Sequence, residues 1–283
     1  MPGTKQAGLT AIGLCVLALT AGCTSEPPGD STFDPGMGHI HALAINPATG
    51  TVYAGTHYGL FTLTDSGAER VGSVAQDFMG LAAAGDDHFL ASGHPSPDDM
   101  DQPVNLGLIE SRDGGDSWDV LSLSGAADFH ALEYKHGIVY GYDSLNQQIM
   151  VSEDKHEWIG GARFPAYDIA VSPLNPDEVI ATVERGPARS TDRGEMFEVL
   201  GGAPALVFVD WPAADELVGI DADGVVYVSA DGGDSWREMG TVGAAPHALL
   251  AAGDGEIYVA TDRGILSSGD NGATFTPLWE DTQ

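Results

Sequence analysis

The chain has 283 residues, of which 11 are Lys or Arg and 42 are Asp or Glu, giving a formal net charge of -31 at pH 7. So acidic a surface repels phosphate backbones and anionic lipid headgroups, which argues against nucleic-acid binding and against electrostatic docking on a membrane. The length suits one large all-β domain or two small ones.

The first 22 residues have the pattern of an export signal. Lys5 precedes an apolar stretch over 7–19, too short for a membrane-spanning helix, and Thr20-Ala21-Gly22 precede Cys23. This ending resembles the lipobox of bacterial lipoproteins, although Leu is commoner than Thr at the first position. The resemblance implies cleavage before Cys23 and lipidation of its sulfur. An ordinary secretory signal with an incidental cysteine is the alternative.

Residues 23–38 are rich in Pro, Gly, Ser and Asp, which predicts a flexible tether. The other cysteine, Cys15, lies inside the signal, so the mature domain has no thiol for a disulfide or a thiolate metal site. We expect a monomeric protein outside the cytoplasm, held at the cell membrane only by its N-terminal lipid, with one folded domain over residues 39–280.

A motif of the form Ser-x-Asp-x-Gly-x-x-aromatic recurs along the chain. Its clean copies are Ser111, Asp113, Gly115 and Trp118; Ser190, Asp192, Gly194 and Phe197; Ser229, Asp231, Gly233 and Trp236; and Ser268, Asp270, Gly272 and Phe275. A shortened copy keeps Ser152, Asp154 and Trp158, and a worn one keeps Asp65 and Gly67. From Ser152 onward the copies start 38 or 39 residues apart, which leaves room for four short strands per repeat, as in a propeller blade.

The motif has a local physical role. Its Ser and Asp side chains can bond backbone N–H groups within a tight turn, its Gly takes the left-handed conformation, and its aromatic residue packs between blades. It resembles the Asp-box, or bacterial neuraminidase repeat, of sialidases, sortilin-type receptors and bacterial glycosyl hydrolases. That resemblance implies an all-β propeller with the box on the hairpin away from the active face, so we assign the motif no chemistry.

Aligned repeats give six sets of strands, and therefore a six-bladed β-propeller. Alternating apolar runs predict innermost strands at 41–45, 79–83, 130–134, 167–171, 206–210 and 247–251, and second strands at 51–56, 88–93, 138–142, 178–183, 216–220 and 256–261. Third strands lead into each motif and fourth strands leave it. One acidic loop, Pro95 to Asn105, exceeds its counterparts, and such loops are often functional.

In such a blade the end of the second strand lies at the edge opposite the motif hairpin. All six residues at this position are His or carboxylate: His57, His94, Asp143, Glu184, Asp221 and Asp262. A carboxylate that opens a turn commonly accepts local N–H groups, which is the simple interpretation of Asp143, Asp221 and Asp262. It explains the two histidines and Glu184 less well.

The starts of the innermost strands lie at the same edge. They carry His41, Met79, His130, Tyr167, Leu206 and His247, with His39 two residues before His41. A single histidine is more often a core residue, but three at one repeat position favour a shared role. We therefore predict that His39, His41, His57, His94, His130, His247 and Met79 hold a metal at the mouth of the axial funnel. Imidazole suits zinc and copper, and Met79 favours copper.

A glycoside hydrolase is the first alternative, because the Asp-box families include such enzymes. Hydrolysis needs two carboxylates roughly 5 to 9 Å apart, for which Asp143 with Glu184, or Asp221 with Asp262, are the candidates. The sialidase version is disfavoured. Sialidases grip their substrate with three arginines and have an early Arg-Ile-Pro-type motif, whereas here the faint equivalent, Arg163-Phe164-Pro165, falls in the fourth repeat.

A non-catalytic interaction platform is the second alternative, as in sortilin-type and photosystem-assembly propellers. It requires only a shaped face, and the acidity of this chain favours a basic partner. The sequence thus leaves open whether the funnel takes a small ligand, a glycan or an exported protein.

Overall fold

A computed structural model describes residues 36–64, 67–97, 99 and 101–280. The predicted signal, most of the tether, Cys23 and Asp65 lie outside the described residues. The chain divides into two units, Met1–Asp34 and Pro35–Gln283, and every described residue belongs to the second. Among these residues no helix is long and apolar enough to cross a membrane.

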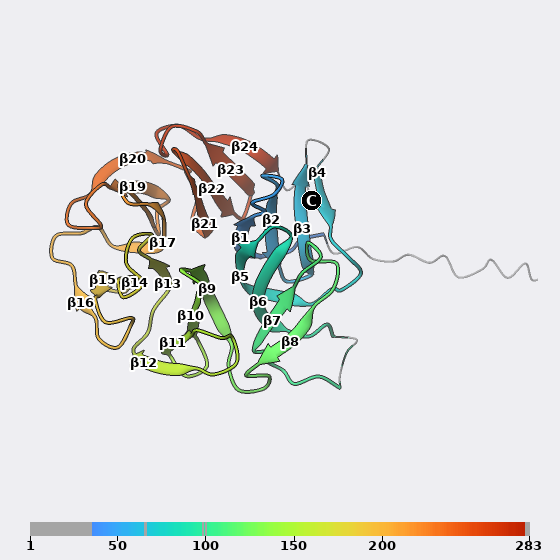
Figure 1. The fold of residues 1–283 in the computed structure, drawn as a ribbon. Coiled ribbons are helices and arrows are strands. Elements are labelled where there is room, and N and C mark those ends of the chain that lie inside the picture. Colours follow the sequence, from blue (N-terminus) through green and yellow to red (C-terminus); the bar gives the residue numbers. More distant parts are fainter. Residues whose placement is uncertain (1–35, 65–66, 98, 100, 281–283) are drawn as a thin grey trace, which may run out of the picture. The chain divides into compact units, whose positions relative to one another are not determined.

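The second unit is all-β and forms the six-bladed propeller expected from the repeats (Figure 1). Blade 1 is β1 (Ile40–Ile45), β2 (Val52–Thr56), β3 (Gly59–Thr64) and β4 (Gly67–Arg70); blade 2 is β5 (Asp77–Gly85), β6 (His88–His94), β7 (Leu108–Ser111) and β8 (Asp119–Ser122); blade 3 is β9 (Phe129–Lys135), β10 (Ile138–Asp143), β11 (Gln148–Ser152) and β12 (Ile159–Arg163). Blade 4 is β13 (Asp168–Val171), β14 (Val179–Val183), β15 (Gly186–Ser190) and β16 (Glu198–Val199); blade 5 is β17 (Leu206–Ala213), β18 (Glu216–Asp221), β19 (Val225–Ser229) and β20 (Arg237–Thr241); blade 6 is β21 (Pro246–Gly253), β22 (Glu256–Thr261), β23 (Gly264–Ser268) and β24 (Thr276–Glu280).

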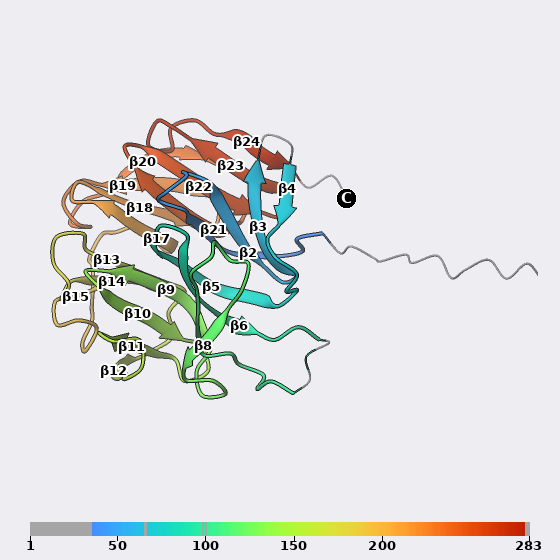
Figure 2. The same ribbon diagram turned by 45° about the vertical axis from the view of Figure 1, so that its right-hand side comes forward.

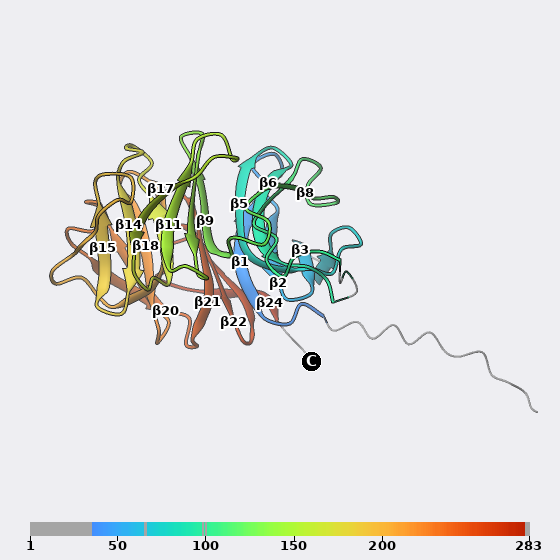
Figure 3. The same ribbon diagram turned by 90° about the horizontal axis from the view of Figure 1, so that it is seen from below.

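Each blade is an antiparallel meander whose strands follow one another in chain order. The first strands, β1, β5, β9, β13, β17 and β21, surround the axis, and Figures 1 and 2 show the fourth strands at the rim. The start of every first strand and the end of every second strand therefore meet at one face, which we call the upper face. The motif hairpins lie at the opposite ends of the blades, as the edge-on view of Figure 3 makes clear.

The second strands are among the most deeply buried of the fold. Every residue of β2 and of β10 is buried. These strands pair on both sides within their own sheet and pack against the neighbouring blades on both faces, so they read as continuous apolar runs instead of alternating ones.

Apolar packing between the first and last blades closes the ring. Ile40 and Leu43 of β1 share one buried cluster with Ala248 of β21 and Ile265 of β23. Within residues 36–280, as far as they are described, each sheet contains only consecutive strands, so closure there relies on side-chain packing.

The motif turns have the geometry that their sequence predicts. Ser111 Oγ donates to Asp113 Oδ1 at 2.8 Å and accepts the N–H of Gly115 at 2.8 Å. Gly115 has φ 99°, and its carbonyl accepts the indole N–H of Trp118 at 3.1 Å. The other three clean copies repeat the bonds of the serine. The motif is thus a folding device at the lower ends of the blades.

The predicted first and second strands agree with the observed ones to within about two residues at most ends. Blade 5 is an instructive exception in register. Leu206 is only 1% exposed and belongs to the core between blades 4 and 5, whereas the next residue, Val207, is half-buried beside a cavity of the upper face. Leu206 is therefore not part of the predicted first-strand column, because side chains alternate along a strand and a shift of one residue reverses the face.

Candidate metal centre

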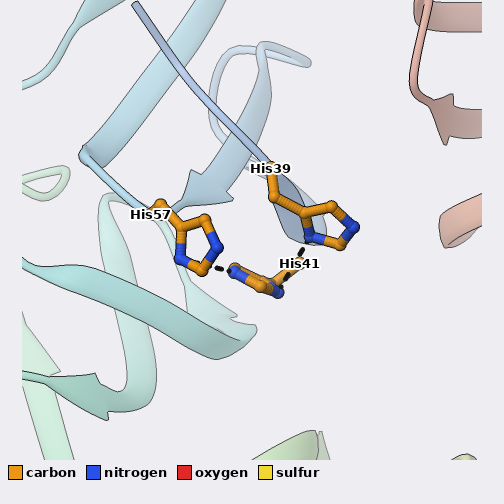
Figure 4. A group of neighbouring side chains, drawn as sticks. All are labelled: His39, His41 and His57. Carbon is orange, nitrogen blue, oxygen red and sulfur yellow. Dashed lines mark hydrogen bonds between the residues drawn. The ribbon is translucent and has the colours of Figure 1, made fainter. Parts of the chain in front are cut away.

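Three histidines of blade 1 converge at the upper face (Figure 4). His39 precedes β1, His41 is its second residue, and His57 directly follows β2. Nδ1 of His39 lies 3.3 Å from Nδ1 of His41, and Nε2 of His41 lies 3.1 Å from Nδ1 of His57. We call these residues the histidine cluster. One ligand nitrogen from each ring lies within 4.8 Å of the others, which is the proximity a shared metal ion requires.

Blade 2 contributes a carboxylate to this cluster. Asp77, the first residue of β5, places Oδ2 3.0 Å from Nδ1 of His57 and Oδ1 3.4 Å from Nε2 of His41. Asp77 Oδ1 is buried and has no hydrogen-bond partner. The ring of His247, from β21 of blade 6, is tilted against that of His39 with the two centroids 4.1 Å apart. The cluster and its immediate neighbours therefore come from three blades.

The spacing of these atoms fits a tetrahedral ion. Zinc–nitrogen bonds of about 2.0–2.1 Å place two ligand atoms of a tetrahedral site roughly 3.3 Å apart. The separations among His41 Nε2, His57 Nδ1 and the Asp77 carboxylate are 3.1, 3.0 and 3.4 Å. These three groups can therefore form one face of such a site with little movement.

Burial keeps two rings of the cluster, His39 and His41, neutral. Burial, reinforced by the charges that His39 and His57 would carry, lowers the pKa of His41 to about 3. Burial, followed by the charge of His247, also lowers the pKa of His39. A neutral imidazole is the form that binds metals, so these rings are competent ligands at neutral pH.

A second group of possible ligands lies at the next seam between blades. His94 ends β6 of blade 2, while Asp128 directly precedes β9 of blade 3 and His130 is the second residue of that strand. Their ligand atoms also lie within 4.8 Å of one another. Although burial acts to raise it, the hydrogen bond from His130 holds the pKa of Asp128 below its usual value. His94, Asp128 and His130 are named the seam group below.

Two predicted carboxylates are engaged in turns. Asp143 is fully buried, and it accepts the N–H groups of Asp128 and Leu145 at 3.1 and 3.2 Å. Asp221 accepts the N–H groups of Asp223 and Val225 at 3.0 and 2.9 Å. The simple turn interpretation is therefore correct for both residues, and neither offers a free acid–base pair with its neighbours.

The remaining members of the two columns are spread around the mouth. Glu184, Asp262 and Tyr167 are exposed. Met79 is half-buried two residues beyond Asp77 in β5. The contacts that blade 2 makes with the histidine cluster come from Asp77, so the prediction of a sulfur ligand has no geometric support of its own.

Below the mouth the axis is a polar channel that contains a cavity of about 250 Å³. Asp168 accepts the N–H of Val209 at 3.0 Å, and Asp210 accepts the N–H of Ala251 at 2.8 Å. Each bond joins the innermost strands of adjacent blades. Burial raises the pKa values of both carboxyl groups, that of Asp168 well above its usual range. Their role is to satisfy edge N–H groups that have no strand partner on the axial side.

A wider cavity of about 540 Å³ opens on the upper face beside His130. Its lining includes Tyr142, Tyr167, Phe208 and Pro246. The mouth therefore combines chelating groups over blades 1 to 3 with a largely apolar hollow next to them.

Asp77 and Asp128 are not among the predicted site residues, although the sequence carries a signal for them. In the first three blades a buried apolar residue at the strand start, Ile40, Phe78 or Phe129, is preceded by His39, Asp77 or Asp128. Each of these polar residues lies two positions before the residue of its blade in the first-strand column. Their side chains therefore project to the same face as that column. Aligning this position across the repeats would have found them.

Comparison with known proteins identifies the fold. No protein-family model and no curated protein matches the sequence. Among solved structures, YCF48 bound to a D1 peptide is 16% identical with a TM-score of 0.54 over 88% of this chain and 82% of that one. An ancestral GH74 enzyme is 14% identical with a TM-score of 0.55 over 88% and 40%, and virginiamycin B lyase from Staphylococcus aureus is 13% identical with a TM-score of 0.57 over 85% and 84%. This chain thus spans less than half of the GH74 enzyme, and these likenesses show the β-propeller fold alone.

Proposed function

We propose that this chain is an exported, lipid-anchored Asp-box propeller that binds a divalent transition metal, zinc or copper, at the histidine cluster. The observation that carries the proposal is the convergence of His41 Nε2, His57 Nδ1 and the Asp77 carboxylate within 3.0 to 3.4 Å. His39 and His247 stand beside them as further imidazoles.

The chemistry of the donors supports a borderline metal. Imidazole nitrogen is a ligand for zinc and copper, while a single carboxylate is too few hard ligands for calcium. Oδ1 of Asp77 makes no hydrogen bond, and a neutral His41 ring has one unprotonated nitrogen, so both have a lone pair that a cation could accept. The strong negative charge of the chain also raises the local concentration of cations.

Titration calorimetry of the chain, purified in mild detergent without chelators, tests the proposal with Zn²⁺ and Cu²⁺. We expect binding tighter than roughly micromolar. The double substitution His41→Ala with His57→Ala should weaken binding at the histidine cluster by about 100-fold or more, because two ligands of that site are removed. His156→Ala, at an exposed histidine far along the chain in blade 3, is the matched control and should bind as the wild type does. Unchanged binding in the double variant would refute the assignment.

Export and anchoring need a separate experiment. Cells fed a labelled fatty acid should incorporate it into the wild-type chain, and Cys23→Ser should abolish the label and release the domain from the membrane fraction. Labelling that persists in Cys23→Ser would contradict the anchor while leaving the metal site untouched.

A further inference from the structure

We propose that the seam group, His94, Asp128 and His130, is a second binding site for a divalent metal of the zinc class, independent of the histidine cluster. Its central residue is Asp128, which connects the two histidines from the neighbouring ends of blades 2 and 3.

One oxygen of Asp128 has no partner. The residue is only 8% exposed, and its Oδ1 makes no hydrogen bond. Its other oxygen, Oδ2, accepts from Nε2 of His130 at 3.0 Å and from Oγ of Ser144 at 2.9 Å. A metal bound by Nε2 of His130 would displace the proton of that bond. A buried carboxylate oxygen without a donor is costly, so Oδ1 marks a position where a cation or a proton donor belongs.

His94 faces this oxygen with Nε2. Nδ1 of His94 lies 3.0 Å from the carbonyl oxygen of Val104, and a carbonyl only accepts, so Nδ1 carries the proton. In the neutral ring Nε2 then has a free lone pair, and it lies 3.9 Å from Oδ1 of Asp128. Two acceptors that face each other across this distance repel unless something positive lies between them. Orientation of a ligand histidine through its other nitrogen is typical of metal sites.

The backbone around Asp128 is fixed by its own bonds. Its N–H donates to the buried Asp143 at 3.1 Å, and its carbonyl accepts the N–H of Ser144 at 2.9 Å. Asp143, predicted as a catalytic acid, thus acts here as a positioning residue for Asp128. Such support reduces the entropy that a ligand would lose on metal binding.

The propeller repeats the arrangement at two successive seams. In both, the histidine that ends or follows a second strand faces the aspartate of the next blade: His57 with Asp77, and His94 with Asp128. The second seam has His130 where the first has Met79, two residues beyond the aspartate. Two imidazoles and one carboxylate are the ligand set of several catalytic zinc sites, which keep a further coordination position open.

Metal stoichiometry tests the site directly. The full chain is dialysed against Zn²⁺, and separately against Co²⁺ so that the ligand field can be followed by absorption. The wild type should bind two ions. His94→Gln with Asp128→Asn should bind one, with the seam affinity reduced roughly 100-fold or more, because two ligands are removed. Asp128→Asn retains the side-chain shape and one oxygen. Thermal denaturation verifies that the variants fold.

The complementary variant separates this proposal from the function proposed above. His41→Ala with His57→Ala should still bind one ion with the absorption spectrum of the seam site, and His156→Ala should bind two. If that double variant binds nothing, or if the seam substitutions leave the stoichiometry unchanged, the second site does not exist. In that case a proton on Nε2 of His94 would be the partner of Asp128.

Discussion

Nε2 of His41 lies 3.1 Å from Nδ1 of His57, although the two rings come from opposite strands of one hairpin. Both rings are held near Asp77 of the next blade. Neither histidine has a positive φ, and the pairing of β1 with β2 shifts register at His41. The proximity has consequences for stability as well as for binding.

The metal-free chain should lose stability in acid through His41. Its pKa is lowered to about 3 in the fold from an ordinary value of 6.5, so the unfolded chain binds more protons between these two values. The free energy of unfolding should therefore rise with pH across this window, and His41→Gln should remove about 3 kcal/mol of that rise. Urea denaturation from pH 3.5 to 7.5 measures it. The exposed His156→Gln should leave the slope unchanged, and an equal slope in both variants would contradict the prediction.

Glu133 in the axial channel should have the opposite effect. Burial outweighs the attraction of Lys135 and raises the pKa of Glu133 to about 7 from 4.5. The stability that the neutral acid provides is complete below pH 4.5 and is lost as the pH rises through 7. Glu133→Gln should thus be more stable than the wild type at pH 8, by about 2 kcal/mol, and equally stable at pH 4. Exposed Glu198→Gln is the control, and a Glu133→Gln variant that is no more stable at pH 8 would disprove the account.

Tyr140 should contribute to the contact between blades 3 and 4. Its hydroxyl, on a fully buried side chain, donates to the carbonyl of Pro176 at 2.7 Å. Tyr140→Phe leaves that carbonyl without a donor and should lower the free energy of unfolding by about 1 to 3 kcal/mol. Tyr167→Phe, at a side chain that is 51% exposed, should change it by less than about 0.5 kcal/mol. Chemical denaturation compares the two, and equal effects would count against the role of the bond.

Two adjacent glycines in one motif turn separate backbone strain from steric clash. Gly114 and Gly115 both have positive φ, 74° and 99°. A Cβ on Gly114 would make only ordinary contacts, at 3.7 Å from Asp87 and Tyr53, whereas a Cβ on Gly115 would lie 2.4 Å from Cδ2 of Leu60 in blade 1. Gly114→Ala should cost about 1 kcal/mol from strain alone, and Gly115→Ala about 3 kcal/mol or more. If thermal denaturation showed Gly115→Ala to be the less destabilised variant, the packing between blades 1 and 2 would have to relax around the new Cβ.

Much of the candidate site could be predicted, but not its pairings. The repeat alignment identified His41, His57, His94 and His130 as neighbours of the upper mouth, and the described structure brings them into two groups. The alignment could not show that Asp143 accepts backbone N–H groups, whereas Asp77 contacts the histidines. An aspartate looks the same in the sequence whether it accepts local N–H groups or contacts side chains of the next blade.

The sequence by itself determined the propeller, because its signals are local. Each Ser-x-Asp-x-Gly turn closes with bonds inside five residues, from Ser111 to Gly115 in the first clean copy, and strand alternation has a fixed period. Only the tertiary structure decided that His57 faces Asp77 and that His94 faces Asp128. Those contacts join residues 20 and 34 positions apart across the seam between two sheets. They depend on the rotation from one blade to the next, on the register of each first strand and on side-chain rotamers. The residues of the repeat motif specify none of these.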